Sequence, residues 1–428
     1  MTFARPATAS AAANAFATAT VTVLALLAGA PRTASGQGFS GYAEAKGFAY
    51  TDRVTDLDPW VVGWQTFFLK QEGKLGTASY SVSARAEAIS SHDRGPLVFD
   101  PADRELRRTP MSVREAWLRL PVASSVDLQA GRFFLGWGKT DGYSPADAFL
   151  PRDLSDPFAD EKLPVWGARA TGQFGTLRFD GVWAATTTPW RLPVLSGRSA
   201  PIDTSAAPVP VYLVDGTSRP PADGFGALRI LASAEEWDVG LWGRTGVRPA
   251  PLIVARIDQA FPTPEGYAVP ADRRYAREDA AGLEVSRVAG PFVLRGEASI
   301  LSSADPELGH ALIWTLGLER AFGDGTLLVT LAANARGTPV DRALLFDRAL
   351  LPGLIVVWDR TERWGGWRVA WTAAFDHGDG LLKSEVSDNL TDEWKVTLGA
   401  EAPYGSRYGP FGARWASRRV HFAVRRSW

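Results

Sequence analysis

Few side chains in this sequence have the types and spacing that catalysis requires. The 428 residues include no cysteine, which excludes disulfide scaffolds, thiolate zinc sites, iron–sulfur clusters and cysteine nucleophiles. The four histidines, His92, His310, His377 and His421, form no His-x-x-x-His pair that could hold a metal. The sequence has no Gly-x-Ser-x-Gly elbow and no Walker loop. We therefore predict no enzyme, no metal site and no cofactor.

Two chemical alternatives stay open. A barrel hydrolase would need a Ser–His pair on its outer wall, but the stretch Asp376-His377-Gly378-Asp379-Gly380 is more typical of a tight loop. The acidic residues between positions 141 and 161 could bind calcium, although their spacing is not that of an EF-hand loop. With 46 basic and 47 acidic side chains, the chain gives no electrostatic reason to expect nucleic acid as a partner.

The most distinctive polar segment runs from Gly131 to Lys162. Its Asp-Gly, Ser-Pro and Pro-Arg-Asp sequences favour ordered turns, and a long loop rich in Pro and Gly is usually functional. Residues 138–163 could form a constriction loop that narrows the interior of a barrel and sets selectivity. They could instead form a structured external loop over its rim. The candidate constriction residues are Asp141, Asp147, Arg152, Asp153 and Asp156.

The elements that would position these residues alternate in polarity with period two. In the segment 80–88, every second residue from Tyr80 to Ala88 is apolar, and the residues between them are serine, arginine and glutamate. The same pattern recurs after Gln37 and predicts β-strands with one apolar and one charged face. In a soluble sandwich the charged faces would meet water, whereas in an outer-membrane barrel they line a lumen and the apolar faces meet lipid.

Three features favour the barrel. Tight turns alternate with long Pro/Asp/Arg-rich loops near 91–109, 138–163, 186–223, 247–277 and 337–350, as expected for short periplasmic turns and long extracellular loops. Aromatic residues cluster at strand ends, as interfacial girdles require. The chain also ends on Trp428, in an alternating strand, which resembles the C-terminal aromatic of outer-membrane barrel assembly signals. We predict an all-β fold, a transmembrane antiparallel β-barrel.

The pattern predicts eighteen strands, with sixteen as the fallback. The two weakest candidates are 352–362 and 381–390. A barrel of this width is too wide for its own wall side chains to fill, so it must hold water, a folded-in loop, or both. The predicted strands are 38–50, 60–71, 77–90, 111–121, 125–136, 165–173, 176–186, 225–234, 236–246, 279–288, 291–302, 310–321, 326–336, 352–362, 366–376, 381–390, 393–402 and 418–428.

The alternation along these predicted strands places charged side chains of both signs on the inner face of the barrel. Such a ring belongs in a water-filled channel, because an unpaired charge in a dry interior is prohibitively costly. Each charge could brace the wall through salt bridges or select solutes directly, and the seven cations from Arg85 onward would favour anions modestly. The pore-lining candidates are Glu44, Lys46, Arg85, Glu87, Arg178, Asp180, Arg244, Arg295, Glu297, Arg368, Lys395 and Arg425.

The first 36 residues differ from the rest of the chain. They carry an early cation, Arg5, then an apolar run from Phe16 to Ala30 and a small-residue stretch that ends at Gly36. This is the pattern of a cleaved signal peptide, and the run is shorter than the ~20 residues a spanning helix needs, although an uncleaved anchor remains the alternative. We predict a signal peptide at 1–36 and an outer-membrane barrel at 37–428.

One stretch resembles a known group of proteins. The run Gly131-Arg132-x4-Trp137-Gly138, followed by Asp141-Gly142-x2-Pro145-x-Asp147 and Pro151-Arg152-Asp153, resembles a segment of porin-like outer-membrane β-barrels, including alginate-export-like and DUF1302-like barrels. The chain departs from that pattern at Ser144-Pro145, where Asn-Pro is expected, and at Trp428, where Phe is commoner. The final strand also resembles an outer-membrane assembly signal, which implies recognition of Trp428 by the barrel assembly machinery.

The predicted function is that of an outer-membrane channel in a Gram-negative envelope. It would pass small hydrophilic solutes by diffusion, as a monomer or a homotrimer in contact with outer-membrane lipid. The alternative is a barrel for export or surface assembly of polysaccharide or lipid. That alternative predicts aromatic tracks through the lumen, for which the inward-pointing Trp117 and Trp242 are the candidates.

Overall fold

The computed structural model describes residues 38–428, apart from 55–57, 92–94, 141, 160, 201–208, 217–218, 265, 337–352 and 408. The predicted signal peptide at 1–36 and the candidate residue Asp141 therefore lie outside the described residues. So does the whole of the predicted loop at 337–350.

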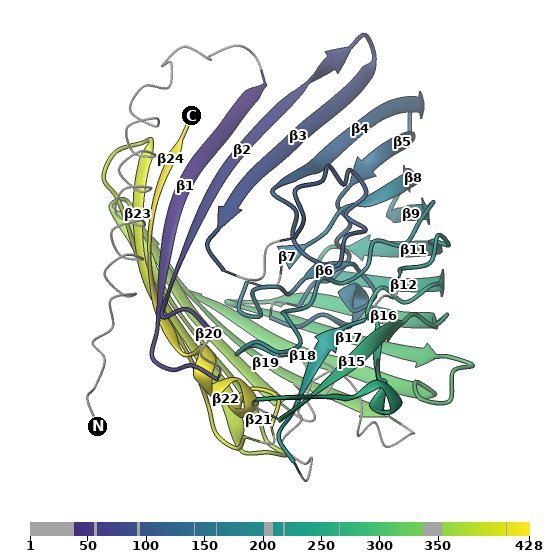
Figure 1. Ribbon diagram of the computed structural model, residues 1–428. Helices are drawn as coiled ribbons and strands as arrows, with labels where there is room; N and C mark the ends of the chain where they lie inside the picture. Colours follow the sequence, from purple (N-terminus) through teal and green to yellow (C-terminus); the bar gives the residue numbers. More distant parts are fainter. Residues whose placement is uncertain are drawn as a thin grey trace.

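The described chain forms one closed ring of eighteen antiparallel strands (Figure 1). The ring closes where β24 pairs with β1, from Tyr42 opposite Ser427 to Tyr50 opposite Arg419. All eighteen predicted strands are present, including the two weakest candidates, so the predicted barrel is confirmed. In ring order the strands are β1 (Phe39–Tyr50), β2 (Val61–Leu75), β3 (Ala78–Ile89), β4 (Met111–Ala123), β5 (Val126–Phe133), β8 (Val165–Phe174), β9 (Leu177–Ala184), β11 (Phe225–Ala234), β12 (Trp237–Gly246), β16 (Asp279–Ala289), β17 (Phe292–Ser302), β18 (His310–Phe322), β19 (Gly325–Arg336), β20 (Gly353–Glu362), β21 (Gly365–Ala374), β22 (Asp379–Asn389), β23 (Trp394–Tyr404) and β24 (Arg419–Ser427).

Short and long connections alternate around the ring. Tight turns such as 76–77, 175–176, 290–291 and 323–324 join strands at one end, and segments such as 90–110, 134–164, 185–224 and 247–278 join them at the other. Several tight turns use glycine in the left-handed region, for example Gly175 at φ 59° and Gly290 at φ 59°. The long connections 90–110, 134–164, 185–224 and 247–278 therefore leave the wall at the end opposite to these tight turns.

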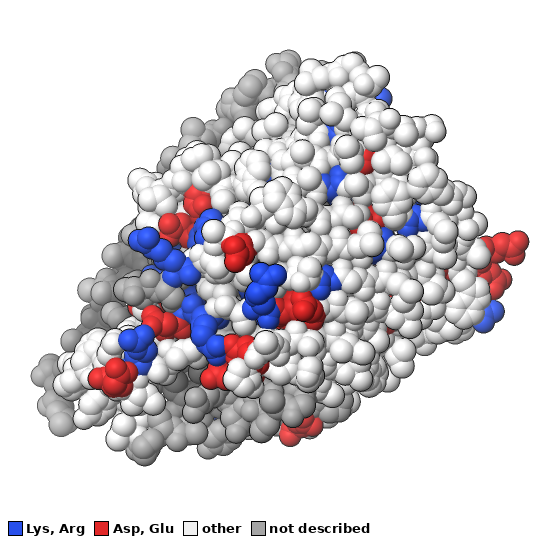
Figure 2. All heavy atoms as spheres, turned by 90° about the vertical axis from the view of Figure 1, so that its right-hand side faces the viewer, with Lys and Arg blue, Asp and Glu red and all other residues white. Residues whose placement is uncertain are grey.

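The outer face of the wall is apolar. On β12 the outward Leu241 is 62% exposed and on β23 the outward Leu398 is 60% exposed, whereas the inward Trp242 beside Leu241 is buried. Figure 2 shows a broad, mostly uncharged surface, with the charged side chains gathered mainly in a band at its lower left. Among the described residues, no helix is long and apolar enough to cross a membrane.

The long connections contain secondary structure that the periodicity did not predict. Segment 134–164 holds a 3-10 turn and a two-residue ladder, and the next two long connections contribute a small sheet of their own. Most of these pieces have five residues or fewer, too short to produce a period, but β15 has nine residues and lies where the sequence predicted only a loop at 247–277. They are η1 (Pro145–Asp147), β6 (Arg152–Asp153) and β7 (Glu161–Lys162), then β10 (Val211–Asp215), β13 (Leu252–Ala255), η2 (Ile257–Gln259), β14 (Phe261–Thr263) and β15 (Gly266–Arg274), and finally η3 (Gly412–Ser417) between β23 and β24.

Gly131 lies near the end of β5, just before the chain leaves the barrel wall. Its φ of +124° lies in the region that disfavours L side chains, and a Cβ there would lie 2.1 Å from the carbonyl oxygen of Ala116 on β4. A glycine is therefore required at the end of β5, two residues before the chain turns into segment 134–164.

Candidate functional site: the barrel interior

Cross-strand pairing fixes which side chains share the inner face. Directly opposed residues in an antiparallel pair point to the same side of the sheet. Glu297 and Arg419 point inward, because both contact segment 134–164, and the pairs on either side extend that face around the ring. All twelve pore-lining candidates, from Glu44 to Arg425, lie on it.

Segment 134–164, here called the interior segment, touches strands on every side of the ring. The Trp137 indole donates to Asp180 on β9 at 2.8 Å, and Lys139 Nζ lies 2.8 Å from Asp238 on β12. On other sides its contacts include β3, β17, β22 and β24. A segment attached to β5 and β8 can reach all of these strands only by crossing the interior, where β6 and β7 lie (Figure 1).

Glu297 on β17 holds the first part of the interior segment. Its Oε1 accepts the backbone N–H of Lys139 at 2.6 Å and of Thr140 at 2.7 Å, as well as the Thr140 hydroxyl at 2.9 Å. Its Oε2 accepts the Ser144 hydroxyl at 2.6 Å and the backbone N–H of Ala146 at 3.1 Å. Five donors thus converge on one buried carboxylate, which compensates its desolvation.

Asp147 closes the interior segment on itself. Its Oδ1 accepts the backbone N–H of Trp137 at 2.8 Å and of Gly138 at 3.0 Å, while its Oδ2 meets Lys162 Nζ at 2.5 Å. The entry and exit of the segment are therefore tied through one side chain. A Cβ at Gly138 would lie 2.1 Å from Ser144 Oγ, so this approach also needs the glycine.

A buried ion network ties the interior segment to two other loops. Asp103 pairs with Arg132 and Arg191, Asp153 pairs with Arg191 and Arg108, and Glu161 pairs with Arg85, Arg108 and Arg114. Because removing one member of a buried pair typically costs about 3–5 kcal/mol, these contacts fix the loops to one another. The members are Arg85, Arg108, Arg114, Arg132 and Arg191, with Glu87, Asp103, Asp153 and Glu161.

Two carboxylates of this network, Asp153 and Glu161 of the interior segment, have lowered pKa values. Burial alone would raise the pKa of Asp153, but Arg108, Arg191 and hydrogen bonds from Ser155 outweigh it and hold that pKa well below its usual range. Burial likewise opposes ionisation of Glu161, and the surrounding arginines still lower its pKa. Both side chains are therefore charged at neutral pH.

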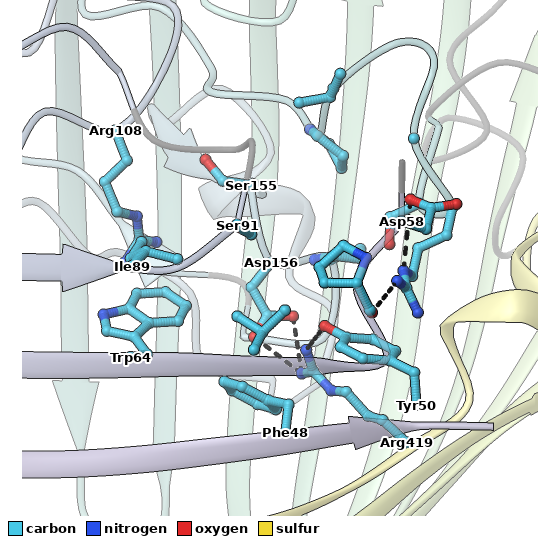
Figure 3. Close-up of a pocket in the computed structure, with 18 of the residues that line it drawn as sticks. Phe48, Tyr50, Asp58, Trp64, Ile89, Ser91, Arg108, Ser155, Asp156 and Arg419 are labelled. Carbon is cyan, nitrogen blue, oxygen red and sulfur yellow. Dashed lines mark hydrogen bonds and ion pairs between the residues drawn. The ribbon is translucent and has the colours of Figure 1, made fainter. Parts of the chain in front are cut away.

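The tip of the interior segment separates two cavities. Arg419 on β24 binds both carboxylate oxygens of Asp156 at 2.9 Å and also pairs with Glu401 at 3.0 Å. On one side lies a cavity of about 220 Å³ lined by Phe48, Tyr50 and Asp156 among others, here called the loop-side cavity (Figure 3). On the other side, against β17–β24, lies a cavity of about 400 Å³, here called the wall cavity.

The inward tryptophans belong to a packed cluster. Trp242 lies 6.4 Å from Trp137 and 5.4 Å from Phe149, measured between ring centroids, and Trp117 packs against the same cluster. Arg244, a pore-lining candidate, is buried with its guanidinium 5.4 Å from the rings of Phe149 and Phe225. The interior segment covers this part of the wall.

The remaining pore-lining candidates divide into paired and unpaired charges. Arg425 lies 2.7 Å from Glu44, and Arg295 lies 2.6 Å from Glu319 rather than beside Glu297. Asp180 pairs with Arg169 on the neighbouring strand β8 rather than with Arg178. Arg85 and Glu87, by contrast, do pair along one strand at 3.1 Å. Lys46 lies over the Phe48 ring. Within the described ranges, four of the candidate cations have no carboxylate at ion-pair distance: Lys46, Arg178, Arg368 and Lys395.

Four of the five constriction-loop candidates are described, and all four lie in the interior segment. Asp147, Asp153 and Asp156 are the anchors above, and Arg152 lines the wall cavity. Sequence reasoning did not identify Asp103, Arg191 or Arg419, because their partners lie 18 to 263 residues away in the chain. Glu297 was found as an inward residue, but its role as an anchor had no local signal.

Known proteins resemble this chain only at the level of solved structures. A scan against models of protein families gives no match, and neither does a search of curated proteins. Among solved structures, a triple mutant of the Rhodopseudomonas blastica porin is 8% identical with a TM-score of 0.40, covering 91% of this chain and 99% of the porin. A loop-deletion mutant of OmpT, an outer membrane protein of Vibrio cholerae, is 9% identical with a TM-score of 0.41, covering 91% and 98%. Similarity at this level carries no argument about this chain, whose own strand pairing establishes the closed barrel.

Proposed function

We propose that this protein is an outer-membrane channel through which small hydrophilic solutes diffuse, and that the interior segment is its constriction. The observation that carries the proposal is the pair of cavities separated by the Asp156–Arg419 contact inside a closed barrel. An eighteen-stranded barrel is too wide for its wall side chains to fill, so the interior segment decides how much of the lumen stays open.

The outer face supports placement in lipid. Outward residues such as Leu241, Ile300 and Leu316 are more than half exposed, which suits hydrocarbon and would be an aggregation hazard in water. Because β24 pairs with β1, the ring of eighteen wall strands has no unpaired edge. At such an edge each unpaired backbone N–H or C=O group would cost several kcal/mol in a bilayer. These features favour the outer membrane, reached after cleavage of a signal peptide.

Trp428 supports the proposed recognition by the barrel assembly machinery. Its backbone exchanges two hydrogen bonds of 3.1 Å with Gly41 on β1, and its ring lies 5.7 Å from that of Phe67 on the outer face of β2. The terminal residue is therefore part of the seam that closes the ring. The proposed channel works as a monomer or as a homotrimer, and the mass of the purified protein in detergent distinguishes the two.

Diffusion is favoured over export of polysaccharide or lipid. An export path needs exposed aromatic rings along the lumen, but Trp242 is packed under Trp137 and Phe149. The polar inner face, with Arg178 and Lys395 free of carboxylate partners in the described part of the chain, fits small hydrated solutes with a modest preference for anions. A non-enzymatic role without cofactor remains part of this proposal.

Reconstitution of the purified full-length chain in a planar lipid bilayer tests the proposal. Stepwise ion conductance with a reversal potential that favours chloride over potassium is the expected result. A bilayer that stays silent although the protein is inserted and folded would contradict diffusion through the barrel.

A further inference from the structure

The wall cavity has two unlike sides. One side is apolar and combines inward residues of the wall with two side chains from the loops, namely Leu301, Ile313, Ile355 and Val357 with Tyr143 and Trp190. Ile313, Ile355 and Val357 are buried although they point into the barrel. They pack against the interior segment, as Ile355 and Val357 do against Tyr143, and they also line the cavity, so this part of its lining suits an apolar group better than a fully hydrated one.

The strands that follow β20 in the ring, β21 and β22, carry positive charge, although Arg368 is also directly opposed by Asp359 on β20. Arg368 on β21 lies opposite Glu385, and Lys383 on β22 lies opposite Ala370, so the two cations are diagonal neighbours on the inner face. Lys383 Nζ donates one hydrogen bond of 2.6 Å to the carbonyl oxygen of Phe158. Arg368 has no carboxylate at ion-pair distance among the residues that the structure describes.

The acids around this cavity are engaged elsewhere. Glu401 pairs with Arg419 at 3.0 Å and lies 3.2 Å from His421. The carboxylate of Glu385 lies 3.8 Å from His421, and Glu278 lies 3.8 Å from Arg248. The Arg368 and Lys383 pair therefore presents donors that a negatively charged group can use.

We propose that the wall cavity binds an amphipathic organic anion, a monocarboxylate with a ring or a branched apolar body. The carboxylate meets Arg368 and Lys383, and the body packs against Ile313, Ile355 and Val357. At about 400 Å³ the cavity falls within the usual size of small-molecule sites, which run from about 300 to 1,000 Å³. This inference rests on the proposed channel and names the solute class that it selects.

Binding of benzoate to the purified full-length protein in detergent tests the inference without relying on conductance. Titration calorimetry should give saturable binding of benzoate. Acetate, which lacks the ring, and benzyl alcohol, which lacks the charge, should each bind at least about tenfold more weakly. Equal affinity for benzoate and acetate would overturn the apolar subsite, and equal affinity for benzoate and benzyl alcohol would overturn the cationic one.

Two matched variants locate the site. Arg368→Gln should weaken benzoate binding about tenfold, whereas Arg178→Gln, which removes an inner-face cation outside the cavity, should leave it within twofold. If both variants lose benzoate affinity equally, binding depends on the total positive charge of the lumen and not on Arg368, and the proposed site is overturned. If Arg368→Gln does not fold, Lys383→Gln provides the same comparison.

The outcome is separable from that of the channel proposal. A protein that binds benzoate as predicted but leaves a bilayer silent contradicts diffusion and keeps the site. A protein that conducts ions but shows no benzoate binding contradicts the site and keeps the channel.

Discussion

The anchoring of the interior segment by Glu297 gives the sharpest single prediction. In Glu297→Gln one carboxylate oxygen becomes an amide NH2, which cannot accept the hydrogen bonds made there. At least one buried backbone N–H, that of Lys139, Thr140 or Ala146, then loses its acceptor. The variant keeps the size of the side chain, so packing is preserved and only the hydrogen bonding changes.

The expected size follows from ordinary hydrogen-bond energies. Leaving one buried donor unsatisfied costs about 1–3 kcal/mol, and the remaining bonds weaken because a charged acceptor becomes neutral. Together these effects should shift the docking equilibrium of residues 139–146 by about 3 kcal/mol, which is on the order of a hundredfold. Hydrogen exchange followed by mass spectrometry should show faster exchange of this stretch by roughly that factor, with larger fluctuations of the single-channel current.

Glu319→Gln is the matched control. Glu319 lies on the inner face of β18 and pairs with Arg295 at 2.6 Å, with partial exposure of both side chains. Its loss should cost below about 1 kcal/mol and leave exchange of residues 139–146 unchanged. Unaltered exchange in Glu297→Gln, or equal acceleration in Glu319→Gln, would refute the anchoring role.

Three further predictions concern acidity, the barrier and lipid contact. Because the pKa values of Asp153 and Glu161 are lowered, their ion pairs stabilise the folded loops above about pH 4, and this stability is lost as pH falls. Hydrogen exchange of residues 153–159, relative to the intrinsic rate at each pH, should therefore be steady from about pH 5 to 8 and accelerate only below about pH 4; acceleration near neutrality would contradict this assignment. Asp156→Asn should weaken the contact with Arg419 between the two cavities and raise single-channel conductance in a bilayer, and an unchanged or lower conductance would argue against a barrier there. Leu241→Arg, on the outer face, should reduce the free energy of folding into lipid vesicles by about 2–4 kcal/mol, and an effect near zero would argue against a lipid-facing position.

The sequence predicted the wall better than its contents. Each wall strand has one face toward the outside of the barrel and one toward its interior, so its residues alternate between apolar and polar over about ten positions. This alternation located strands such as Phe292–Ser302 to within a residue or two. It was weakest at 352–362, where Leu354, Ile355, Val356 and Val357 form a continuous apolar run. The structure explains this run, because Ile355 and Val357 face inward yet pack under Tyr143 of the interior segment.

The contacts inside the barrel had no local signal. Asp103 meets Arg191 across 88 residues of sequence, and Arg419 meets Asp156 across 263. Such partners are brought together only by ring closure and by the path of the loops, neither of which has a period. The sequence showed that segment 138–163 is acidic. Whether the segment lies over the rim or inside the barrel depends on the arginines that its carboxylates bind, and these are distant in the sequence.

Because the chain has no cysteine, single introduced cysteines can report directly on which face of the wall meets water. The decisive comparison is the current through Lys395→Cys and Leu398→Cys channels during exposure to a charged, water-soluble thiol reagent, since Lys395 lies on the inner face of β23 and Leu398 on its outer face. We expect a stepwise fall in current for Lys395→Cys and none for Leu398→Cys. Labelling of Leu398→Cys with no effect on Lys395→Cys would contradict a water-filled interior bounded by lipid.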